Sequence, residues 1–240
     1  MIISLEGNIG TGKTSLLKYF QQYCKNILND VGILNKENNI NRQILFDNGI
    51  NSIEDIVFLF EPVDKWLEMK DDITGENILE KFYKDKKRWG YSFQMNVYIT
   101  RLKDIISNNH KKLIFVERSI LTDRNVFAKL LNQDDYISNL EWKLYDEWYE
   151  LLKNTYNITP DKCVYLRCDP HISHERVIKR GRKEENNITL DYITKLSIMH
   201  DNWLLNYRDV CIINVNKDFV SDSTEVNNIL STIIQLLRIN

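Results

Sequence analysis

The sequence predicts an α/β fold, a three-layer α/β/α sandwich in which helices cover both faces of a five-stranded parallel sheet. Three observations carry this prediction. Five short apolar runs suit strands that are buried on both faces. Segments whose apolar residues recur at helical spacing alternate with these runs. The chain has 240 residues, a common length for one α/β domain, so a single domain over residues 1–240 is expected.

Each element follows from its own pattern. Strands are expected over residues 1–5, 56–60, 113–116, 163–166 and 211–215. Helices are expected over 14–29 and 91–107, and helical spacing also marks 140–152, 171–180, 192–203 and 226–237. Residues 32–52 are polar and rich in asparagine, with a weak apolar patch at 44–46. This composition favours a long loop or a partly helical surface insertion.

The bulk composition restricts the partners. A net charge of −2 differs from the strongly basic character of most nucleic-acid-binding domains, so no nucleic acid partner is expected. No apolar run approaches the ~20 residues that span a bilayer, and no basic segment with an apolar leader begins the chain. We therefore expect a protein without membrane contact or targeting signal, located in the cytoplasm or elsewhere inside the cell.

Residues 7–14 fit the phosphate-binding pattern Gly-x4-Gly-Lys-Thr, between the first apolar run and an amphipathic helix. Glycines let backbone N–H groups turn toward a phosphate, Lys13 supplies a charge, and Thr14 supplies a hydroxyl for Mg²⁺. The expected ligands are ATP or another nucleoside triphosphate, and Mg²⁺. The predicted phosphate-binding set is Gly7, Asn8, Ile9, Gly10, Thr11, Gly12, Lys13 and Thr14.

Two acids follow buried strands directly. Glu61 comes after the second strand and Glu117 ends the third, and open parallel sheets bind ligands at this edge. Glu117 has the position of the second acid of P-loop enzymes, which helps to hold Mg²⁺ opposite the hydroxyl of Thr14. Glu61 could take a proton from an acceptor hydroxyl. A solvated loop acid is the alternative interpretation of Glu61.

Polar side chains also mark one face of the helix over 91–107. Gln94, Val97 and Arg101 share a stripe from which an amide and a guanidinium could read the edge of a planar base. A solvated polar stripe remains the alternative. Asp123 lies just past the third strand, so we expect Arg101 and Asp123 to meet at the far wall of a base pocket.

Three arginines, Arg176, Arg180 and Arg182, gather beside Gly181. They form a candidate clamp on a transferring phosphate, and a solvated basic face is the alternative. Phosphoryl transfer needs a base and a stabilised negative charge. Glu61 would supply the first, and Lys13, Mg²⁺ and the arginines the second.

Taken together, these motifs resemble the deoxyribonucleoside kinase family of P-loop kinases, and the resemblance extends over nearly the whole chain. Its residues are Gly7 to Thr14, Glu61-Pro62 with Trp66, Tyr83, Arg88-Trp89, Ser92-Phe93-Gln94, Glu117-Arg118-Ser119, Asp123-Arg124, Arg176, and Arg180-Gly181-Arg182 with Glu184-Glu185. The resemblance implies transfer of the γ-phosphate of ATP or another triphosphate to the 5′-hydroxyl of a deoxynucleoside, for nucleotide salvage, by a homodimer.

The resemblance also implies a role for individual residues. Glu61 is then the base for the 5′-hydroxyl, and Arg118 holds that oxygen and the incoming phosphate. Gln94 pairs with the nucleobase, and Trp66 and Phe127 line its pocket.

Tyr83 and Glu185 hold the sugar 3′-hydroxyl by the same resemblance, and Thr14 and Glu117 attend the magnesium. Residues 171–186 are the lid that carries the three arginines. The residues near the base of the donor are Asn216, Lys217, Asp218 and Phe219.

Base preference depends on the wall of the pocket. In the family, an Arg–Asp pair such as Arg101 with Asp123 accompanies deoxycytidine and purine deoxynucleoside kinases. Deoxycytidine or a purine deoxynucleoside is therefore expected to be preferred over thymidine. Val97 is larger than the alanine expected in a strict deoxycytidine enzyme, which leaves room for breadth.

The sequence departs from the family in two places. Gly10 and Thr11 stand where small alanines are usual, and residues 32–52 are surplus. Two other functions remain open at this point, a nucleoside monophosphate kinase similar to thymidylate kinase and a non-catalytic P-loop nucleotide-binding or switch protein. Glu61 argues against the first, because its charge would repel an acceptor that already carries phosphate.

Overall fold

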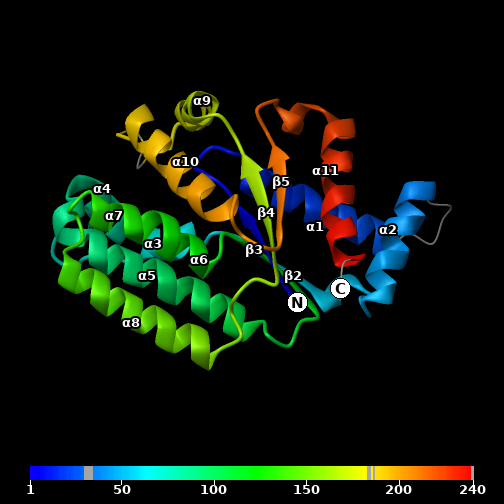
Figure 1. The fold of residues 1–240 in the computed structure, drawn as a ribbon, viewed down its shortest axis with the longest axis horizontal. Helices are drawn as coiled ribbons and strands as arrows, with labels where there is room; N and C mark the ends of the chain where they lie inside the picture. The colour runs from blue at the N-terminus through cyan, green and yellow to red at the C-terminus, as the bar shows by residue number, and fades with distance from the viewer. Residues whose placement is uncertain (30–34, 183–184, 186, 239–240) are drawn as a thin grey trace.

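The computed structural model describes residues 1–29, 35–182, 185 and 187–238, and it confirms the α/β architecture. Five parallel strands form one sheet in the order β2-β3-β1-β4-β5. Their bounds are β1 Ile2–Glu6, β2 Ile56–Leu59, β3 Leu113–Glu117, β4 Lys162–Arg167 and β5 Val210–Asn214. Figure 1 shows the sheet in the middle, with helices on both of its sides.

The register of the central strands brings the predicted acids to one edge. Leu5 of β1 pairs with Glu117 of β3, and Leu59 of β2 pairs with Val116. Glu61 comes two residues after Leu59, the last residue of β2. The chain therefore leaves the sheet beside the end of β3, and Glu61 lies near Glu117. The phosphate-binding loop starts directly after β1, the strand between β3 and β4. The carboxyl edge of the sheet therefore gathers the loop and both acids, as a parallel arrangement requires.

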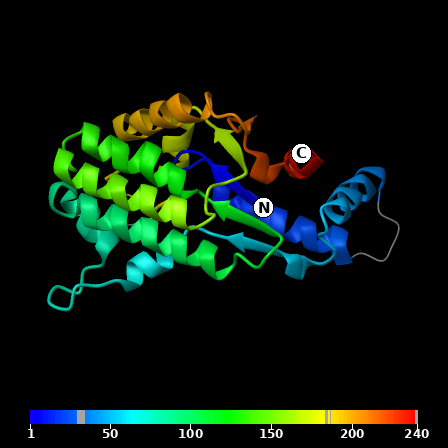
Figure 2. The ribbon, with the colours of Figure 1, turned by 60° about the horizontal axis from the view of Figure 1, so that its bottom comes forward.

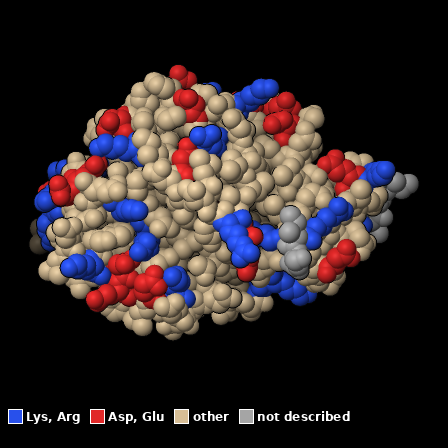
Figure 3. All heavy atoms as spheres, in the orientation of Figure 1, with Lys and Arg blue, Asp and Glu red and all other residues tan. Residues whose placement is uncertain are grey.

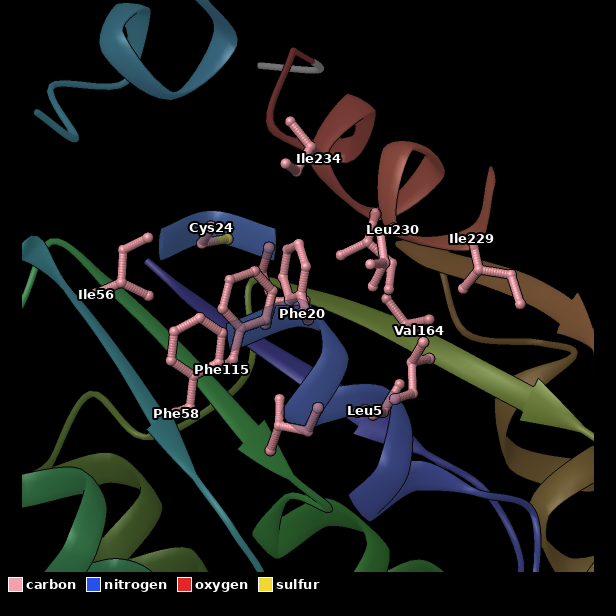
Figure 4. Packing of buried hydrophobic residues seen from close by; sticks show 14 of the residues in the cluster. Leu5, Phe20, Cys24, Ile56, Phe58, Phe115, Val164, Ile229, Leu230 and Ile234 are labelled. Carbon is pink, nitrogen blue, oxygen red and sulfur yellow. The ribbon is translucent and has the colours of Figure 1, made fainter. Parts of the chain in front are cut away.

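One face of the sheet is covered by α1 (Lys13–Asn29), α2 (Lys36–Asp47) and α11 (Ser223–Gln235), which lie together on the right of Figure 1. Aromatic rings join α1 to the strands. The Phe20 ring meets that of Phe115 edge to face, with centroids 4.5 Å apart, and Phe58 stacks on Phe115 at 5.5 Å. Figure 4 shows these rings between the sheet and the side chains of α11. This core anchors the helix that begins inside the phosphate-binding loop.

The opposite face packs against α5 (Lys86–Ser107), α8 (Asn139–Thr155) and α10 (Leu190–Leu204). Tyr98 of α5 and Tyr145 of α8 are almost wholly buried in the core that includes Ile114 and Val116 of β3. Figure 2 shows α5 and α8 side by side, and the connection between α3 and α4 projecting from the molecule. The core thus fixes the long helix that carries Gln94 and Arg101.

The remaining elements connect these layers. After β3 and the two residues Arg118 and Ser119, three of these elements, α6, the π-helix η2 and α7, follow one another without a break. Their bounds are α3 Val63–Glu68, α4 Ile78–Lys84, α6 Ile120–Thr122, η2 Asp123–Ala128, α7 Lys129–Gln133 and α9 Pro170–Arg180, with short 3₁₀ turns η1 Ile53–Asp55, η4 Phe219–Ser221 and η5 Leu236–Arg238.

The segment 32–52 contains a helix, as the partly helical alternative expects, but one face of that helix is buried, which the polar composition did not indicate. Positions 32–34 lie outside the described residues. Residues 36–47 form α2, whose Ile44 and Leu45 belong to the same core as Phe20. Asn41 is fully buried, donates to Ser231 Oγ at 3.0 Å and accepts from Gln235 Nε2 at 2.9 Å. The buried face of α2 therefore carries an asparagine beside its apolar residues, and hydrogen bonds hold the position where a further apolar residue would be expected.

No helix in the described part of the chain is long and apolar enough to cross a membrane. On the face shown in Figure 3, basic and acidic side chains are interspersed.

Candidate active site

A cavity of about 300 Å³ opens at the carboxyl edge of the sheet, a size at the lower end for small-molecule sites. Most of the predicted site residues line it. They are Ile9, Gly10, Gly12, Lys13, Thr14, Glu61, Trp66, Tyr83, Gln94, Val97, Arg101, Glu117, Arg118, Asp123, Phe127, Arg180, Arg182 and Glu185. Val63, Leu79, Phe82, Phe93 and Tyr192 also line it, and none of them was among the predicted site residues.

The phosphate-binding loop depends on glycine at two close approaches. Gly10 has φ +83°, and a Cβ there would lie 2.3 Å from the carbonyl oxygen of Ser173 on α9. Gly12 has φ +89°, and a Cβ there would lie 2.8 Å from the ring of Phe219. Both positions are therefore closed to L side chains. The glycine at position 10, unusual for the resembling family, is explained by the close contact with α9.

Other residues of the loop hold its shape and do not line the cavity. Asn8 Nδ2 donates to the carbonyl of Ile193 at 2.8 Å and to Ser197 Oγ at 2.7 Å, which fixes the loop to α10. Thr11 Oγ1 donates to the carbonyl of Asn8 at 3.0 Å.

Lys13 is buried at the centre of the site. Its Nζ donates to the carbonyl oxygen of Asn8 at 2.6 Å. Burial, together with the positive charge of Arg118, lowers the pKa of Lys13 to about 7. The ammonium of Lys13 therefore loses its proton near neutral pH, and the negative charge of a bound polyphosphate would favour the protonated form again.

Thr14 and Glu117 meet across the loop. Thr14 Oγ1 donates to Glu117 Oε1 at 2.7 Å, so a hydroxyl and a carboxylate stand side by side at the cavity wall. Hydroxyl and carboxylate oxygens are the donors that Mg²⁺ takes alongside substrate phosphates. Among the described residues, no group of three or more His, Cys, Asp or Glu side chains could form an all-protein metal cage. The donor set therefore fits a metal ion that is shared with phosphate.

Glu61 accepts two charged hydrogen bonds on one oxygen. Arg118 Nη1 donates to its Oε1 at 2.6 Å, and Arg101 Nη2 donates to the same atom at 2.7 Å. Burial by itself would raise the pKa of Glu61, but Arg118, Arg101 and Lys13 outweigh it and lower that pKa to about 2. No hydrogen bond from a described side chain reaches the other oxygen, Oε2. Glu61 is therefore an oriented carboxylate with one oxygen free for a ligand.

Arg118 carries the least common backbone conformation in the site. Its φ is 60°, in the left-handed region that costs a non-glycine residue roughly 1–3 kcal/mol. Its guanidinium lies over the ring of Phe127, 5.2 Å from the centroid, while it also binds Glu61. The surrounding structure must hold this backbone, because an isolated turn would relax.

The expected contact between Arg101 and Asp123 is confirmed. Arg101 Nε donates to Asp123 Oδ1 at 3.2 Å and lies 3.0 Å from Oδ2. The same guanidinium donates through Nη1 to the carbonyl of Glu117 at 2.6 Å. Burial raises the pKa of Asp123 to about 6, although Arg101 opposes that shift. The pair forms a rigid, buried wall of the cavity.

Gln94 Oε1 is a buried acceptor that receives no hydrogen bond within the described part of the chain. Asp123 Oδ2 receives none either, but Arg101 Nε lies 3.0 Å away and offsets its charge. An unpaired buried polar group costs about 1–3 kcal/mol, so Gln94 Oε1 in particular favours a ligand that brings a donor. Trp66 and Phe93, whose centroids lie 5.5 Å apart, give the same pocket apolar walls.

Tyr83 of α4, Arg180 at the end of α9, and Arg182 and Glu185 after it line another part of the cavity. Burial raises the pKa of Tyr83 well above its usual value, and the nearby Tyr192 and Glu185 reinforce the shift. Glu185 binds Arg180 through Oε2 and Arg182 Nη1, at 3.4 Å, through Oε1. Positions 183, 184 and 186 of the expected lid lie outside the described residues.

Arg176 corrects the expected clamp of three arginines. Its Nη1 donates to the carbonyl of Val215 at 2.8 Å, and its Nη2 to those of Asn216 and Lys217 at 3.1 Å each. It therefore fixes the loop after β5 and takes no part in lining the cavity. That loop lies outside the lining as well, and Phe219 packs on Gly12 from behind the phosphate-binding loop.

Comparisons with known proteins agree with this geometry. Residues 3–238 match the deoxynucleoside kinase family. The chain is 32% identical over 243 residues to the probable deoxycytidine kinase of fowlpox virus, which covers 98% of this chain and 87% of the relative. It is 28% identical over 223 residues to the deoxycytidine kinase of Bos taurus, covering 85% and 75%. It is 27% identical over 258 residues to the mitochondrial deoxyguanosine kinase of Xenopus laevis, covering 94% and 86%.

Proposed function

The chain belongs to the deoxynucleoside kinase family, and we propose that it transfers the γ-phosphate of ATP or another triphosphate to deoxycytidine or a purine deoxynucleoside. The observation that carries the choice of acceptor is the buried carboxylate of Asp123, which Arg101 holds at the cavity wall, together with Gln94 Oε1, which accepts no hydrogen bond within the described residues. Cytosine and adenine present an exocyclic amino group with two donors, and guanine presents N–H donors on its pairing edge. Thymine also has one N–H donor for Gln94, but toward Asp123 it offers an acceptor and a methyl group in place of an amino group.

Glu61 is the proposed base. Its Oε1 is held by Arg101 and Arg118, which leaves Oε2 to accept the proton of the 5′-hydroxyl. With a pKa of about 2, this carboxylate is a weak base that stays ionised. Such a weak base takes the proton only late in the reaction, after the hydroxyl oxygen has begun to bond to phosphorus and the hydroxyl has become acidic. The loose transition state of phosphoryl transfer allows this order.

Positive groups stabilise the negative charge of the moving phosphoryl group. Lys13 and Arg118 line the cavity with Glu61, and so do Arg180, the last residue of α9, and Arg182, which follows that helix. Charges that are already oriented cost no reorganisation when the transition state forms. Thr14 and Glu117 would hold Mg²⁺ together with phosphate oxygens, and the ion would neutralise part of their charge when bound.

We propose that the donor's base sits near residues 216–219, outside the cavity. Phe219 supports Gly12, and Arg176 fixes the backbone of Asn216 and Lys217. Tyr83 and Glu185 both line the cavity, which supports their proposed role in holding the sugar 3′-hydroxyl.

A homodimer is the assembly that the exposed surface supports. Leu140, Leu144, Trp148 and Leu151 lie along one face of α8 and are 68%, 43%, 49% and 56% exposed. A second copy could cover this face through a twofold interface, in which the same stripe serves both subunits. Sedimentation should give twice the chain mass of 28.6 kDa, and Leu144→Glu with Leu151→Glu should give the monomer. Ile73→Glu, at a residue that is 95% exposed elsewhere, is the matched control.

Steady-state kinetics test the function. We expect Mg²⁺-dependent phosphorylation of deoxynucleosides, with kcat/KM at least tenfold higher than for the corresponding monophosphates. A preference for monophosphates would instead favour a nucleoside monophosphate kinase. No turnover of either, with ATP binding intact, would favour a non-catalytic nucleotide-binding protein. Lys13→Ala, prepared in parallel, reveals any contaminating kinase.

A further inference from the structure

Glu6 is a buried carboxylate at the end of β1 that the proposed mechanism does not use. It is fully buried and does not line the cavity. Its Oε1 accepts from the backbone N–H of Ser119 at 3.1 Å and from Ser119 Oγ at 2.7 Å. Its Oε2 accepts from Thr122 Oγ1. No ion pair to Glu6 is formed within the described residues, so these three donors alone offset the cost of its burial.

Through these hydrogen bonds Glu6 joins two parts of the site, the phosphate-binding loop and the segment that carries Arg118. Glu6 directly precedes Gly7, the first residue of the phosphate-binding loop, and Ser119 directly follows Arg118. The backbone N–H of Arg118 donates to the carbonyl of Leu5 at 3.0 Å. Adjacent residues of β1 therefore hold the backbone of Arg118 from both sides, Leu5 at residue 118 and Glu6 at residue 119.

Arg118 needs such support because its φ is 60°. A non-glycine residue stays in the left-handed region only where its surroundings hold it there. If the N–H of Ser119 lost its acceptor, the turn could relax, and the guanidinium that binds Glu61 at 2.6 Å would move with it. Displacement of about 1 Å in a positioning group can cost 10²-fold in rate.

We propose that Glu6 is a positioning residue that fixes Arg118 in its left-handed conformation and sets its distance from the phosphate-binding loop. This inference rests on the proposed function, since it concerns the same phosphoryl transfer. A purely structural role is the alternative, in which Glu6 only stabilises the junction of β1 and β3. The two roles differ in what they do to kcat of the folded enzyme.

Glu6→Met removes both acceptor oxygens, and with them all three hydrogen bonds, while keeping the length of the side chain. We expect kcat to fall by about tenfold to a hundredfold, with the KM for the deoxynucleoside changed by less than about threefold. Glu6→Gln keeps one oxygen for Ser119 and should restore most of kcat. Ser4→Ala is the matched control, because Ser4 is buried on the same strand and bonds to Cys163 on the side away from β3. It should leave kcat unchanged.

A double-mutant cycle distinguishes action through Arg118 from any other route. In an Arg118→Ala background, Glu6→Met should lower kcat by less than about twofold, because the group that it positions is gone. An equal loss in both backgrounds would contradict the proposal. If Glu6→Met does not fold, Ser119→Ala and Thr122→Val each remove one donor and should each lower kcat severalfold.

Thermal unfolding and circular dichroism of every variant separate stability from turnover. A lower melting temperature with unchanged kcat in Glu6→Met would reduce Glu6 to a structural residue. In that case the wild-type enzyme still phosphorylates deoxynucleosides, and the proposed function stands. Inactivity of the wild type toward all deoxynucleosides would overturn both proposals together.

Discussion

Arg101 Nη2 donates to Glu61 Oε1 at 2.7 Å, so the wall of the base pocket is bonded directly to the proposed catalytic base. The same guanidinium contacts Asp123, which faces the cavity where the nucleobase would lie. Base selection and proton transfer therefore share one charged side chain. A substitution that changes the pocket at Arg101 must also change the pKa of Glu61, because Arg101 is one of the charges that lower it.

Glu61→Gln should lower kcat by about 10²–10⁴, the usual contribution of positioned proton transfer, with little change in deoxynucleoside affinity. The amide keeps the size of the side chain and one acceptor for the arginines. Single-turnover kinetics and equilibrium binding measure the two quantities separately. Turnover close to that of the wild type would remove Glu61 from the mechanism.

Arg176 within α9 and Arg182 just after it should differ in their effects. Arg182 lines the cavity, whereas Arg176 binds the carbonyls of the loop after β5. Arg182→Ala should therefore lower kcat more than it weakens donor binding, since it acts on charge that builds up during transfer. Arg176→Ala should mainly raise the KM for the donor, by loosening residues 215–217. Equal losses of donor affinity and kcat in Arg182→Ala would indicate ground-state binding alone.

Donor binding should weaken as the pH rises. The pKa of Lys13 is about 7, so its amine is charged below that pH and loses its charge above it. Phosphates bind the charged form, so the KM for ATP should rise between pH 7 and 9, by up to about tenfold per pH unit. Lys13→Arg is the control, because its guanidinium stays protonated and should give a KM that does not change over this range. A constant KM in the wild type would contradict the low pKa.

Sequence patterns predicted those parts of the site that are set by a contiguous motif, by the end of a strand or by one face of a helix. Lys13 and Thr14 follow from a contiguous motif. Glu61 and Glu117 meet because parallel strands end at one edge, which the order of apolar runs already indicates. The pairing of Arg101 with Asp123 could be inferred because a helix face and a strand end fix both positions.

Other features depend on contacts that spacing does not encode. Arg176 binds carbonyls about 40 residues away, so its sequence neighbours, which suggested a phosphate clamp, were a poor guide. Glu6 was missed because it looks like the polar end of an apolar strand. The buried face of α2 was missed because Asn41 occupies a core position that an apolar residue would have revealed.

The packing of α2 predicts that substitutions on its buried face lower the free energy of unfolding, which the polar composition of the segment does not suggest. Leu45 is fully buried against the same core as Phe20, so Leu45→Ala should cost about 2–5 kcal/mol of unfolding free energy. Ile40 lies on the outer side of the same helix and is 37% exposed, so Ile40→Ala should cost well under half as much. Urea unfolding at equilibrium measures both. Equal, small effects would restore the view of 35–52 as a dispensable surface segment.

Base preference can be changed at the Arg101–Asp123 pair. Arg101→Met with Asp123→Ala removes the donors and acceptors of the wall and makes room for the 5-methyl group of thymine. The ratio of kcat/KM for thymidine to that for deoxycytidine should rise by tenfold to a few hundredfold, which corresponds to the roughly 1–3 kcal/mol that pocket shape and one mismatch supply. An unchanged ranking of the four deoxynucleosides would show that the pair does not select the base.

The same double variant should also be slower and should titrate differently. Without Arg101, Glu61 loses one of the charges that hold its pKa at about 2, so that pKa should rise and the acidic limb of the kcat profile should move to higher pH. In the wild type, Asp123 has a pKa of about 6 and is protonated below it. Protonation removes the negative charge and weakens Asp123 as an acceptor for an exocyclic amino group, so the KM for deoxycytidine should rise as the pH falls from 7 to 5. Asp123→Asn, which cannot titrate, should lack this rise, and a rise of the same size in that variant would assign the effect to another group.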